Sequence, residues 1–155
     1  RYSGIDKDEF MRQLGDFSSQ MGCDSELLAM TMYLETKFNP KYCSPGSSNY
    51  GVLQIHERSA GRLGINYTDL QHMKASEQLR FLPFVFTSPP ASLIDAWMMM
   101  YLPSGLGRGY DFKFRLPSRW KTANALFELD TFGCIKKRDA EILLTKHFMK
   151  LGWGS

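Results

Sequence analysis

Residues 24–40 read DSELLAMTMYLETKFNP, and this stretch carries the pattern that decides the fold. Asp24 can accept hydrogen bonds from the free amides at the start of a helix, and apolar residues follow at helical spacing up to Leu34. Asn39 and Pro40 stop the helix, because proline lacks an amide hydrogen and its ring blocks the preceding turn. The stretch predicts a largely apolar helix whose last turn carries Glu35.

The segments on either side of this helix predict further helices. Residues 91–101 (ASLIDAWMMMY) are apolar on nearly every side, which indicates a central helix packed all round. Residues 102–117 are predicted to form the longest loop, of the kind that often serves as a lid or binding wall. No sustained alternating strand pattern occurs, so we expect an all-α fold. Other helices are expected at residues 6–21, after Ile55 as far as Gly61 to Gly64, at 76–86 with a kink at Pro83, at about 119–129 and at 138–151.

Composition predicts one globular domain over residues 1–155. The chain is 43% hydrophobic, 14% aromatic and 23% charged, which is enough apolar material to offset chain entropy. No apolar run approaches the roughly 20 residues of a membrane span. The polar start of the chain has no signal-peptide pattern and no Met, so we expect a processed or excised part of a longer protein.

The net charge of +3 is mild and spread along the chain. A nucleic-acid-binding protein would more often show a clustered basic stripe, so no nucleic-acid partner is expected. A weak positive bias suits an anionic partner such as a bacterial cell wall. The three cysteines include no Cys-x-x-Cys pair, so neither a disulfide framework nor a structural zinc site is expected.

Motifs for metal binding, nucleophilic catalysis and phosphate binding are incomplete or absent in this sequence. Residues 128–139 (ELDTFGCIKKRD) have the frame of a calcium loop, but Phe132 replaces an oxygen ligand and three cations follow, so a helix connector is favoured. The three histidines lack metal-ligand spacing, and there is no nucleophile elbow or phosphate loop. We therefore expect neither a metal nor an organic cofactor. The basic and aromatic residues 108–115 favour a solvated lid over a site for an anionic polymer.

Glu35 is the strongest candidate for catalysis. It ends an apolar helix just before a loop, where burial would favour the neutral acid. A carboxyl group that holds its proton at working pH can protonate the leaving oxygen of a glycosidic bond. The alternative for this position alone is an ordinary solvated glutamate at a helix end.

The residues around Glu35 resemble a known family. The order ETKFNP (35–40), a Ser/Gly/Asn loop, NYGVLQI (49–55), Ser59-Ala60 and Leu63-Gly64 is similar to the lytic transglycosylases and goose-type lysozymes, which cleave peptidoglycan. The close match covers about residues 24–65. The resemblance implies a single lysozyme-like domain with a substrate cleft between the Glu35 helix and the wall formed by residues 51–55.

The resemblance also implies a mechanism and a set of site residues. Glu35 would protonate the oxygen that links N-acetylmuramic acid to N-acetylglucosamine, then deprotonate the muramyl C6 hydroxyl, which closes a 1,6-anhydro ring. Other site residues are Asn49, Tyr50, Gly51, Gln54 and Tyr101. Tyr101 would bring its hydroxyl near Glu35, and glycine at position 51 would let a sugar ring approach the backbone.

Each of these site residues also has a structural alternative. Gln54 and Tyr101 could instead be buried polar groups that tie helix to loop. Tyr50 could stack on a sugar or plug the loop, and Asn49 could bind substrate or cap its own turn.

One departure from the family pattern points to a subgroup. Tyr101 is followed by Leu-Pro-Ser-Gly, where the family usually has Asn-Ala-Gly. With residues 120–139, this resembles transglycosylase domains of bacteriophage virion proteins. We therefore expect a virion-associated module that acts in the bacterial periplasm or cell wall and joins the phage particle through regions outside this chain. A secreted bacterial enzyme is the alternative.

Two rival functions remain open. The first is simple hydrolysis by a lysozyme, in which a second carboxylate activates water. Asp69, Glu57 and Asp95 are candidates for that second acid, although none lies in a motif that supports the role. The second rival is a non-catalytic glycan-binding or structural virion domain.

Overall fold

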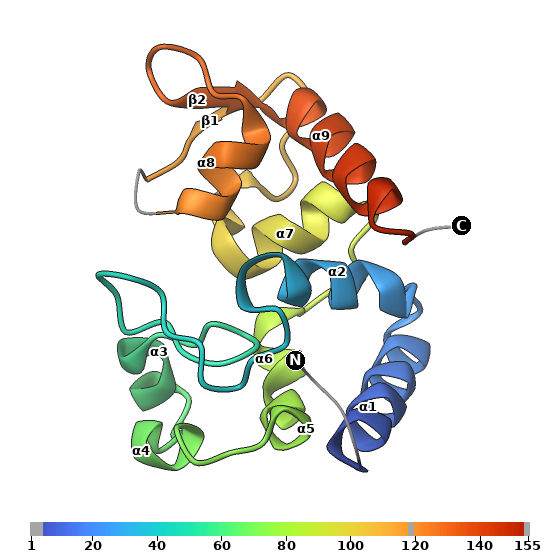
Figure 1. Cartoon of the computed structure of the whole chain (residues 1–155), viewed down its shortest axis with the longest axis vertical. Helices are drawn as coiled ribbons and strands as arrows, with labels where there is room; N and C mark the ends of the chain where they lie inside the picture. Colours follow the sequence, from blue (N-terminus) through green and yellow to red (C-terminus); the bar gives the residue numbers. More distant parts are fainter. Residues whose placement is uncertain (1–4, 118–119, 154–155) are drawn as a thin grey trace. The chain divides into compact units, whose positions relative to one another are not determined.

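The computed structural model describes residues 5–117 and 120–153 (Figure 1). The chain divides into two compact units, a first unit of residues 1–89 and a second unit of residues 90–155. Helices dominate both units, which confirms the mainly helical fold class. A single lysozyme-like domain over residues 1–155 stays a prediction.

The first unit contains the predicted N-terminal helices. Helix α1 ends before Gly22, whose left-handed φ of 82° lets its amide donate to the Ser18 carbonyl oxygen at 2.8 Å. Asp24 caps α2 as expected, and its carboxylate accepts from the Glu26 amide at 2.9 Å. The described elements of this unit are α1 (Ile5–Met21), α2 (Ser25–Thr36), α3 (Glu57–Arg62), α4 (Tyr67–Leu70), α5 (Ala75–Gln78), the 3-10 helix η1 (Leu79–Phe81) and α6 (Leu82–Val85).

Helix α2 ends at Thr36, before the stop predicted at Asn39 and Pro40. Lys37 and Phe38 both adopt left-handed backbone conformations, with φ of 52° and 61°. The Lys37 amide donates to the Tyr33 carbonyl oxygen at 2.9 Å, which closes the last turn. The helix therefore stops at a left-handed cap before proline can act on it, so Glu35 lies in the final turn.

The helix predicted at residues 76–86 is divided into three short pieces. Helix α5, the 3-10 helix η1 and helix α6 follow one another, and Pro83 lies in the first turn of α6. Proline is tolerated there because that turn has no internal amide partner to lose. The predicted single kinked helix is therefore replaced by three contiguous pieces, the middle one a 3-10 helix, and Phe84 is exposed.

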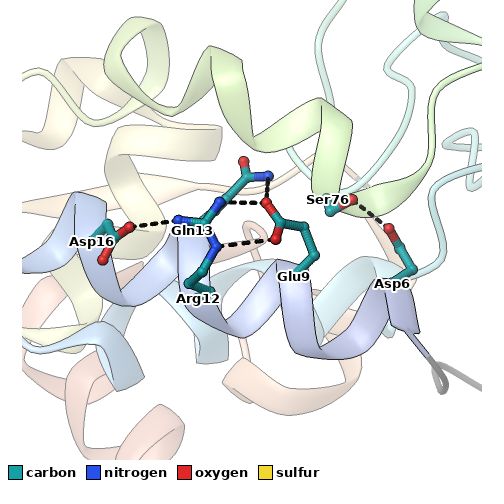
Figure 2. A network of polar contacts seen from close by, with 6 residues as sticks. All are labelled: Asp6, Glu9, Arg12, Gln13, Asp16 and Ser76. Atoms are coloured by element: carbon teal, nitrogen blue, oxygen red, sulfur yellow. Dashed lines mark hydrogen bonds and ion pairs between the residues drawn. The ribbon is translucent and has the colours of Figure 1, made fainter.

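Helix α1 packs against α2 and α5 and carries a polar network on its outer face (Figure 2). The Arg12 guanidinium bonds to Glu9 and, at 2.9 Å, to Asp16. Ser76 donates to Asp6, which ties α5 to the first turn of α1. The opposite face buries Phe10 and Leu14 in the core of this unit.

The second unit is built around α7 (Leu93–Tyr101). This helix is buried on most sides, as its composition predicted, and Trp97 at its centre lies against other aromatic rings of the unit. The other described elements are the 3-10 helix η2 (Pro103–Gly105), β1 (Lys113–Arg115), α8 (Lys121–Phe127), β2 (Cys134–Lys136) and α9 (Lys137–Lys150). The start predicted for the helix at about 119 lies outside the described residues.

A small sheet in the second unit corrects the all-α prediction. Strands β1 and β2 pair antiparallel, with Phe114 opposite Ile135 and Arg115 opposite Cys134. Phe114 and Ile135 are buried while the flanking residues point outward. Three residues give only one inward position, too few for a recognisable alternation. All of β2 lies inside residues 128–139, which the sequence predicted to be a helix connector.

Lys137, the first residue of α9, is buried in the second unit with only 4% of its surface exposed. Its ammonium is 2.8 Å from the Asp95 carboxylate and donates to the carbonyl oxygen of Arg108 at 3.1 Å. This side chain anchors the loop after η2 to α7 and α9. In the part of the chain that the structure describes, none of the helices combines the length and apolar character needed to cross a membrane.

Candidate active site

Glu35 is half-buried in the last turn of α2, between the buried residues Leu34 and Thr36. Thr36 donates to the Met32 carbonyl oxygen at 2.5 Å and accepts from the Phe38 amide at 3.2 Å. These bonds stabilise the two left-handed residues that follow, each of which costs about 1 to 2 kcal/mol for a residue with a Cβ atom. The chain thus turns sharply just after the acid.

The loop that follows is held by Gln78, which is buried on α5. Its side-chain oxygen accepts from the Val52 amide at 2.9 Å, and its nitrogen donates to the Pro40 carbonyl oxygen at 2.8 Å. A second bond from the nitrogen reaches the Met73 carbonyl oxygen at 3.3 Å. One amide therefore joins both ends of the loop between α2 and the 51–55 wall. The sequence pattern predicted only a helix over residues 76–86 and did not indicate this contact.

Gly51 is glycine for a reason internal to the loop. Its φ is 80°, and a Cβ atom built there would lie 2.3 Å from the side-chain oxygen of Gln78. Any larger residue would be strained in its backbone and would collide with the anchor. A role in letting a sugar approach remains a prediction beside this structural requirement.

The Gln54 side chain is 6% exposed and is engaged at both ends. Its nitrogen donates to the carbonyl oxygens of Gly51 at 2.8 Å and Tyr42 at 3.2 Å, and its oxygen accepts from the Ser44 hydroxyl. Of the two alternatives for Gln54, this arrangement favours a buried polar tie within the loop. It maintains the left-handed φ of 52° at Gln54 itself.

Tyr50 lies in the centre of the loop and is 9% exposed. It exchanges two backbone hydrogen bonds with Ile55, and its hydroxyl donates to the Gln71 carbonyl oxygen at 3.4 Å. The ring packs edge to face on Tyr67 with centroids 6.1 Å apart. This burial favours the alternative in which Tyr50 fills the interior of the loop over the one in which it stacks on a sugar.

Asn49 differs from Gln54 and Tyr50 in that its side-chain hydrogen-bonding groups are not used within the loop. Its backbone amide and carbonyl bond to Ser47 and Ser44. Its half-buried side-chain amide makes no hydrogen bond to any residue that the structure describes. Of the residues proposed in this loop, Asn49 therefore has the most capacity left for a ligand.

Tyr42 is a site residue that sequence analysis missed. Burial raises the pKa of its phenol, and the negative charges of Glu35 and Cys43 raise it further. The phenol is therefore within the electrostatic reach of Glu35. Its carbonyl oxygen accepts from the Gly51 amide at 2.8 Å, which fixes this residue to the wall. A tyrosine seven positions after the acid, at the start of the loop, is the only signal the sequence offered.

Cys43 follows Tyr42 and begins the small antiparallel arrangement of the loop. It pairs with Tyr50 in an isolated bridge, and its exposed thiol donates weakly to the Ser47 carbonyl oxygen at 3.3 Å. No disulfide is formed by the three cysteines.

Tyr101 is the last residue of α7 and belongs to the second unit, whereas Glu35 belongs to the first. Its ring lies 5.5 Å from Trp97 and 5.9 Å from Trp120, and its hydroxyl is buried. The approach of this hydroxyl to Glu35 stays a prediction.

The candidates for a second acid differ in their surroundings. Glu57 and Asp69 are exposed on short helices of the first unit. Asp95 is paired with the buried ammonium of Lys137. A carboxylate committed to a buried ion pair is a poor base for water, which weakens Asp95 as a candidate.

One acidic side chain of residues 128–139, that of Asp130, is bonded within the second unit. The Asp130 carboxylate accepts from the amides of Phe132 at 2.8 Å and Cys134 at 3.0 Å, and Lys113 lies 3.0 Å from its other oxygen. These contacts hold the pKa of Asp130 below its ordinary value, with the Cys134 amide as the largest cause. Among the described residues, no group of three or more His, Cys, Asp or Glu side chains could hold a metal ion.

The acid, its left-handed cap and the loop anchored by Gln78 form a local arrangement within the first unit. Comparisons with protein-family models, with curated proteins and with solved structures find no match for this chain.

Proposed function

We propose that this protein is a lytic transglycosylase that cleaves the bond between N-acetylmuramic acid and N-acetylglucosamine in peptidoglycan. The observation that carries the proposal is the placement of Glu35: half-buried, in the last turn of α2, within the electrostatic reach of Tyr42. A general acid needs this combination of a fixed backbone, partial desolvation and a neighbouring polar group.

In the proposed reaction one side chain transfers two protons. The Glu35 carboxyl donates its proton to the glycosidic oxygen as the bond to muramyl C1 breaks. The resulting carboxylate takes the proton of the muramyl C6 hydroxyl, whose oxygen bonds to C1 and closes the anhydro ring. Atoms balance without water, so the reaction needs no second carboxylate. Tyr42 is assigned a positioning role in this proposal, because the charge of Glu35 acts on its half-buried phenol.

The order of the loop supports the same proposal. The side chains of Gln78 and Gln54 hold the wall in one shape through internal hydrogen bonds. The absence of a side chain at Gly51 leaves the room that Gln78 occupies. Asn49 retains a side-chain amide that can address an N-acetyl or hydroxyl group of the glycan. Assembly into a phage particle, and action in the periplasm or cell wall, belong to the same proposal and rest on the sequence resemblance.

The test is digestion of purified peptidoglycan followed by mass spectrometry of the released fragments. The wild-type chain should release anhydromuropeptides, and Glu35→Gln should lower that release by at least about a hundredfold, since general acid catalysis contributes that much or more. Glu26→Gln, at the other end of the same helix, is the matched control and should keep wild-type activity.

Other outcomes would replace the proposal. Fragments with reducing muramic acid ends would identify a hydrolase, and Glu57→Gln and Asp69→Asn would then be tested for the second acid. Binding to peptidoglycan without release of fragments would identify a non-catalytic glycan-binding domain.

A further inference from the structure

A hollow of about 690 Å³ lies in the second unit, at the end of the two-stranded sheet. Its volume falls in the range of small-molecule sites, roughly 300 to 1,000 Å³. It lies apart in sequence from Glu35 and from the loop at residues 40–55. Its lining includes Arg115, Leu116, Asn124, Thr131, Phe132 and Gly133.

One wall of the hollow is a turn fixed by Asp130. Besides the two amides bonded to its side chain, its carbonyl oxygen accepts from the Gly133 amide at 3.0 Å, and its own amide donates to the Cys134 carbonyl oxygen at 2.9 Å. The Gly133 carbonyl oxygen accepts from Leu116 at 3.1 Å, which joins the turn to the chain after β1. The turn is therefore preformed, so binding there need not order it.

This turn presents Phe132 to solvent. The side chain is 77% exposed, more than any other large hydrophobic residue that the structure describes. Its exposure contributes nothing to the core, although the turn that holds it is tied by several hydrogen bonds. A flat apolar ring held beside a hollow is suited to pack against one face of a ligand ring.

Arg115 supplies the charge of the hollow. It is exposed at the end of β1, opposite Cys134, and its side chain runs along the turn: a Cβ atom built on Gly133 would lie 3.8 Å from its Nε. Its guanidinium makes no hydrogen bond, ion pair or cation–π contact with any described residue. By contrast, Lys113 and Arg138 in the same unit are each paired with a carboxylate.

Polar groups that suit hydroxyl recognition complete the lining. The Asn124 side-chain nitrogen donates to the carbonyl oxygens of Pro117 and Trp120, at 2.8 and 2.9 Å. Its side-chain oxygen remains able to accept, and Thr131 adds an exposed hydroxyl. The surrounding unit is basic: residues 90–155 hold ten Lys and Arg against six Asp and Glu.

We propose that this hollow binds an anionic saccharide, namely a pyranose ring that carries a carboxylate. The Arg115 guanidinium would hold the carboxylate through two parallel hydrogen bonds, and the Phe132 ring would cover the sugar face. Identification of the saccharide as a muramic acid unit rests on the proposed function. The carboxylate would then come either from the lactyl group of the sugar or from its attached peptide.

The experiment is a ligand-observed NMR titration of the full chain with three probes. N-acetylmuramic acid carries the lactyl carboxylate, N-acetylglucosamine is the same ring without it, and muramyl dipeptide has its carboxylate on the peptide. We expect N-acetylglucosamine to bind about tenfold more weakly or worse, as for loss of a charge-assisted hydrogen bond. Whichever acidic probe binds more tightly identifies the source of the carboxylate.

Variants locate the binding to the hollow. Arg115→Gln should weaken binding of the acidic probes about tenfold and leave N-acetylglucosamine unaffected, while Arg115→Lys, which keeps the charge and loses the fork, should give an intermediate loss. Phe132→Ala should weaken all three probes. Arg138→Gln removes an arginine already paired with Asp111 and is the matched control, expected to bind like wild type.

Equal binding of the acidic and neutral sugars, or wild-type binding by Arg115→Gln, would overturn the inference. These readouts need no catalysis, so they separate the two proposals. Anhydromuropeptide release without Arg115-dependent binding rejects only the hollow, and Arg115-dependent binding without release rejects only the transglycosylase.

Discussion

In each unit of the molecule a buried polar side chain from a helix anchors a long loop, and the two anchoring side chains differ in charge. In the first unit the neutral amide of Gln78 accepts from Val52 and donates to Pro40. In the second unit the ammonium of Lys137 donates to the loop after η2 and is paired with Asp95. An amide both donates and accepts, so it needs no partner of opposite charge. An ammonium only donates, so its burial depends on the carboxylate beside it.

Of the substitutions considered, Asp95→Ala is expected to lower the free energy of unfolding most. Removal of the carboxylate leaves the Lys137 ammonium buried without a counter-charge, and breaking such a pair typically destabilises a protein by about 3 to 5 kcal/mol. Urea unfolding followed by far-ultraviolet circular dichroism measures the loss. The double variant Asp95→Ala/Lys137→Met should recover part of it, because the unpaired charge is gone.

Asp111→Asn is the control for that measurement. It breaks the exposed pair between Asp111 and Arg138, which should cost about 1 kcal/mol or less. If Asp95→Ala lowers the free energy of unfolding no more than Asp111→Asn does, the buried pair of Lys137 and Asp95 is no more important than a surface pair. That result would contradict the proposed difference between the two anchors.

The neutral anchor is tested by a double-mutant cycle of Gly51→Ala and Gln78→Ala. Gln78→Ala removes the acceptor of the buried Val52 amide, at a cost of about 1 to 3 kcal/mol. Gly51→Ala adds the strain of a left-handed φ, about 1 to 2 kcal/mol, and a collision with Gln78. The collision disappears in the double variant, so its unfolding free energy should exceed the additive expectation. Strict additivity would contradict the contact between Gly51 and Gln78.

A smaller effect tests whether the anchored loop places Tyr42 beside Glu35. The Glu35 charge contributes to the raised pKa of the Tyr42 phenol, so Glu35→Gln should lower that pKa while the larger effect of burial remains. Phenolate absorbance during alkaline titration measures the change. The shift should vanish in a Tyr42→Phe background, and a shift that persists there would assign it to another tyrosine.

The smallest effect on stability is expected for the exposed polar network of α1 (Figure 2). It shows what charged side chains contribute when they are not buried. Hydrogen bonds from Arg12, and then from Gln13, lower the pKa of Glu9 from 4.5 to about 2. The ionised Glu9 therefore stabilises the fold above its ordinary pKa, and this contribution is lost as the pH falls from 4.5 towards 2. Thermal unfolding of Glu9→Gln should depend less steeply on pH in that range than wild type, and an unchanged slope would contradict the prediction.

Sequence patterns predicted the elements whose signals are local. The cap at Asp24 and the apolar run of α7 each act within a few residues, so the corresponding helices are confirmed. The end of α2 was misplaced because Lys37 and Phe38 adopt conformations that favour glycine. Their cost is offset by contacts of Thr36 that residue type alone does not reveal.

The site was predictable only as far as its residues are neighbours in sequence. Glu35 and the 49–55 stretch could be named from their order, but Gln78 bonds to Val52 across 26 positions in sequence. The charge of Glu35 acts on the Tyr42 phenol across seven positions, which the residue order does not reveal. Gln54 and Tyr50 have the polar groups expected of ligand contacts, yet the fold uses those groups internally. Side-chain chemistry suggested a role, whereas burial and partners decided between the alternatives.

The thiol of Cys43 provides a chemical handle on the candidate active site. It is exposed, whereas Cys23 and Cys134 are half-buried, and burial raises the pKa of Cys23, which lowers its thiolate fraction. A maleimide dye added in limiting amount should therefore label position 43 first. Because the adjacent residue, Tyr42, lies within the electrostatic reach of Glu35, a fluorophore at position 43 should report glycan binding under the proposed function, in the Glu35→Gln chain as well as in wild type.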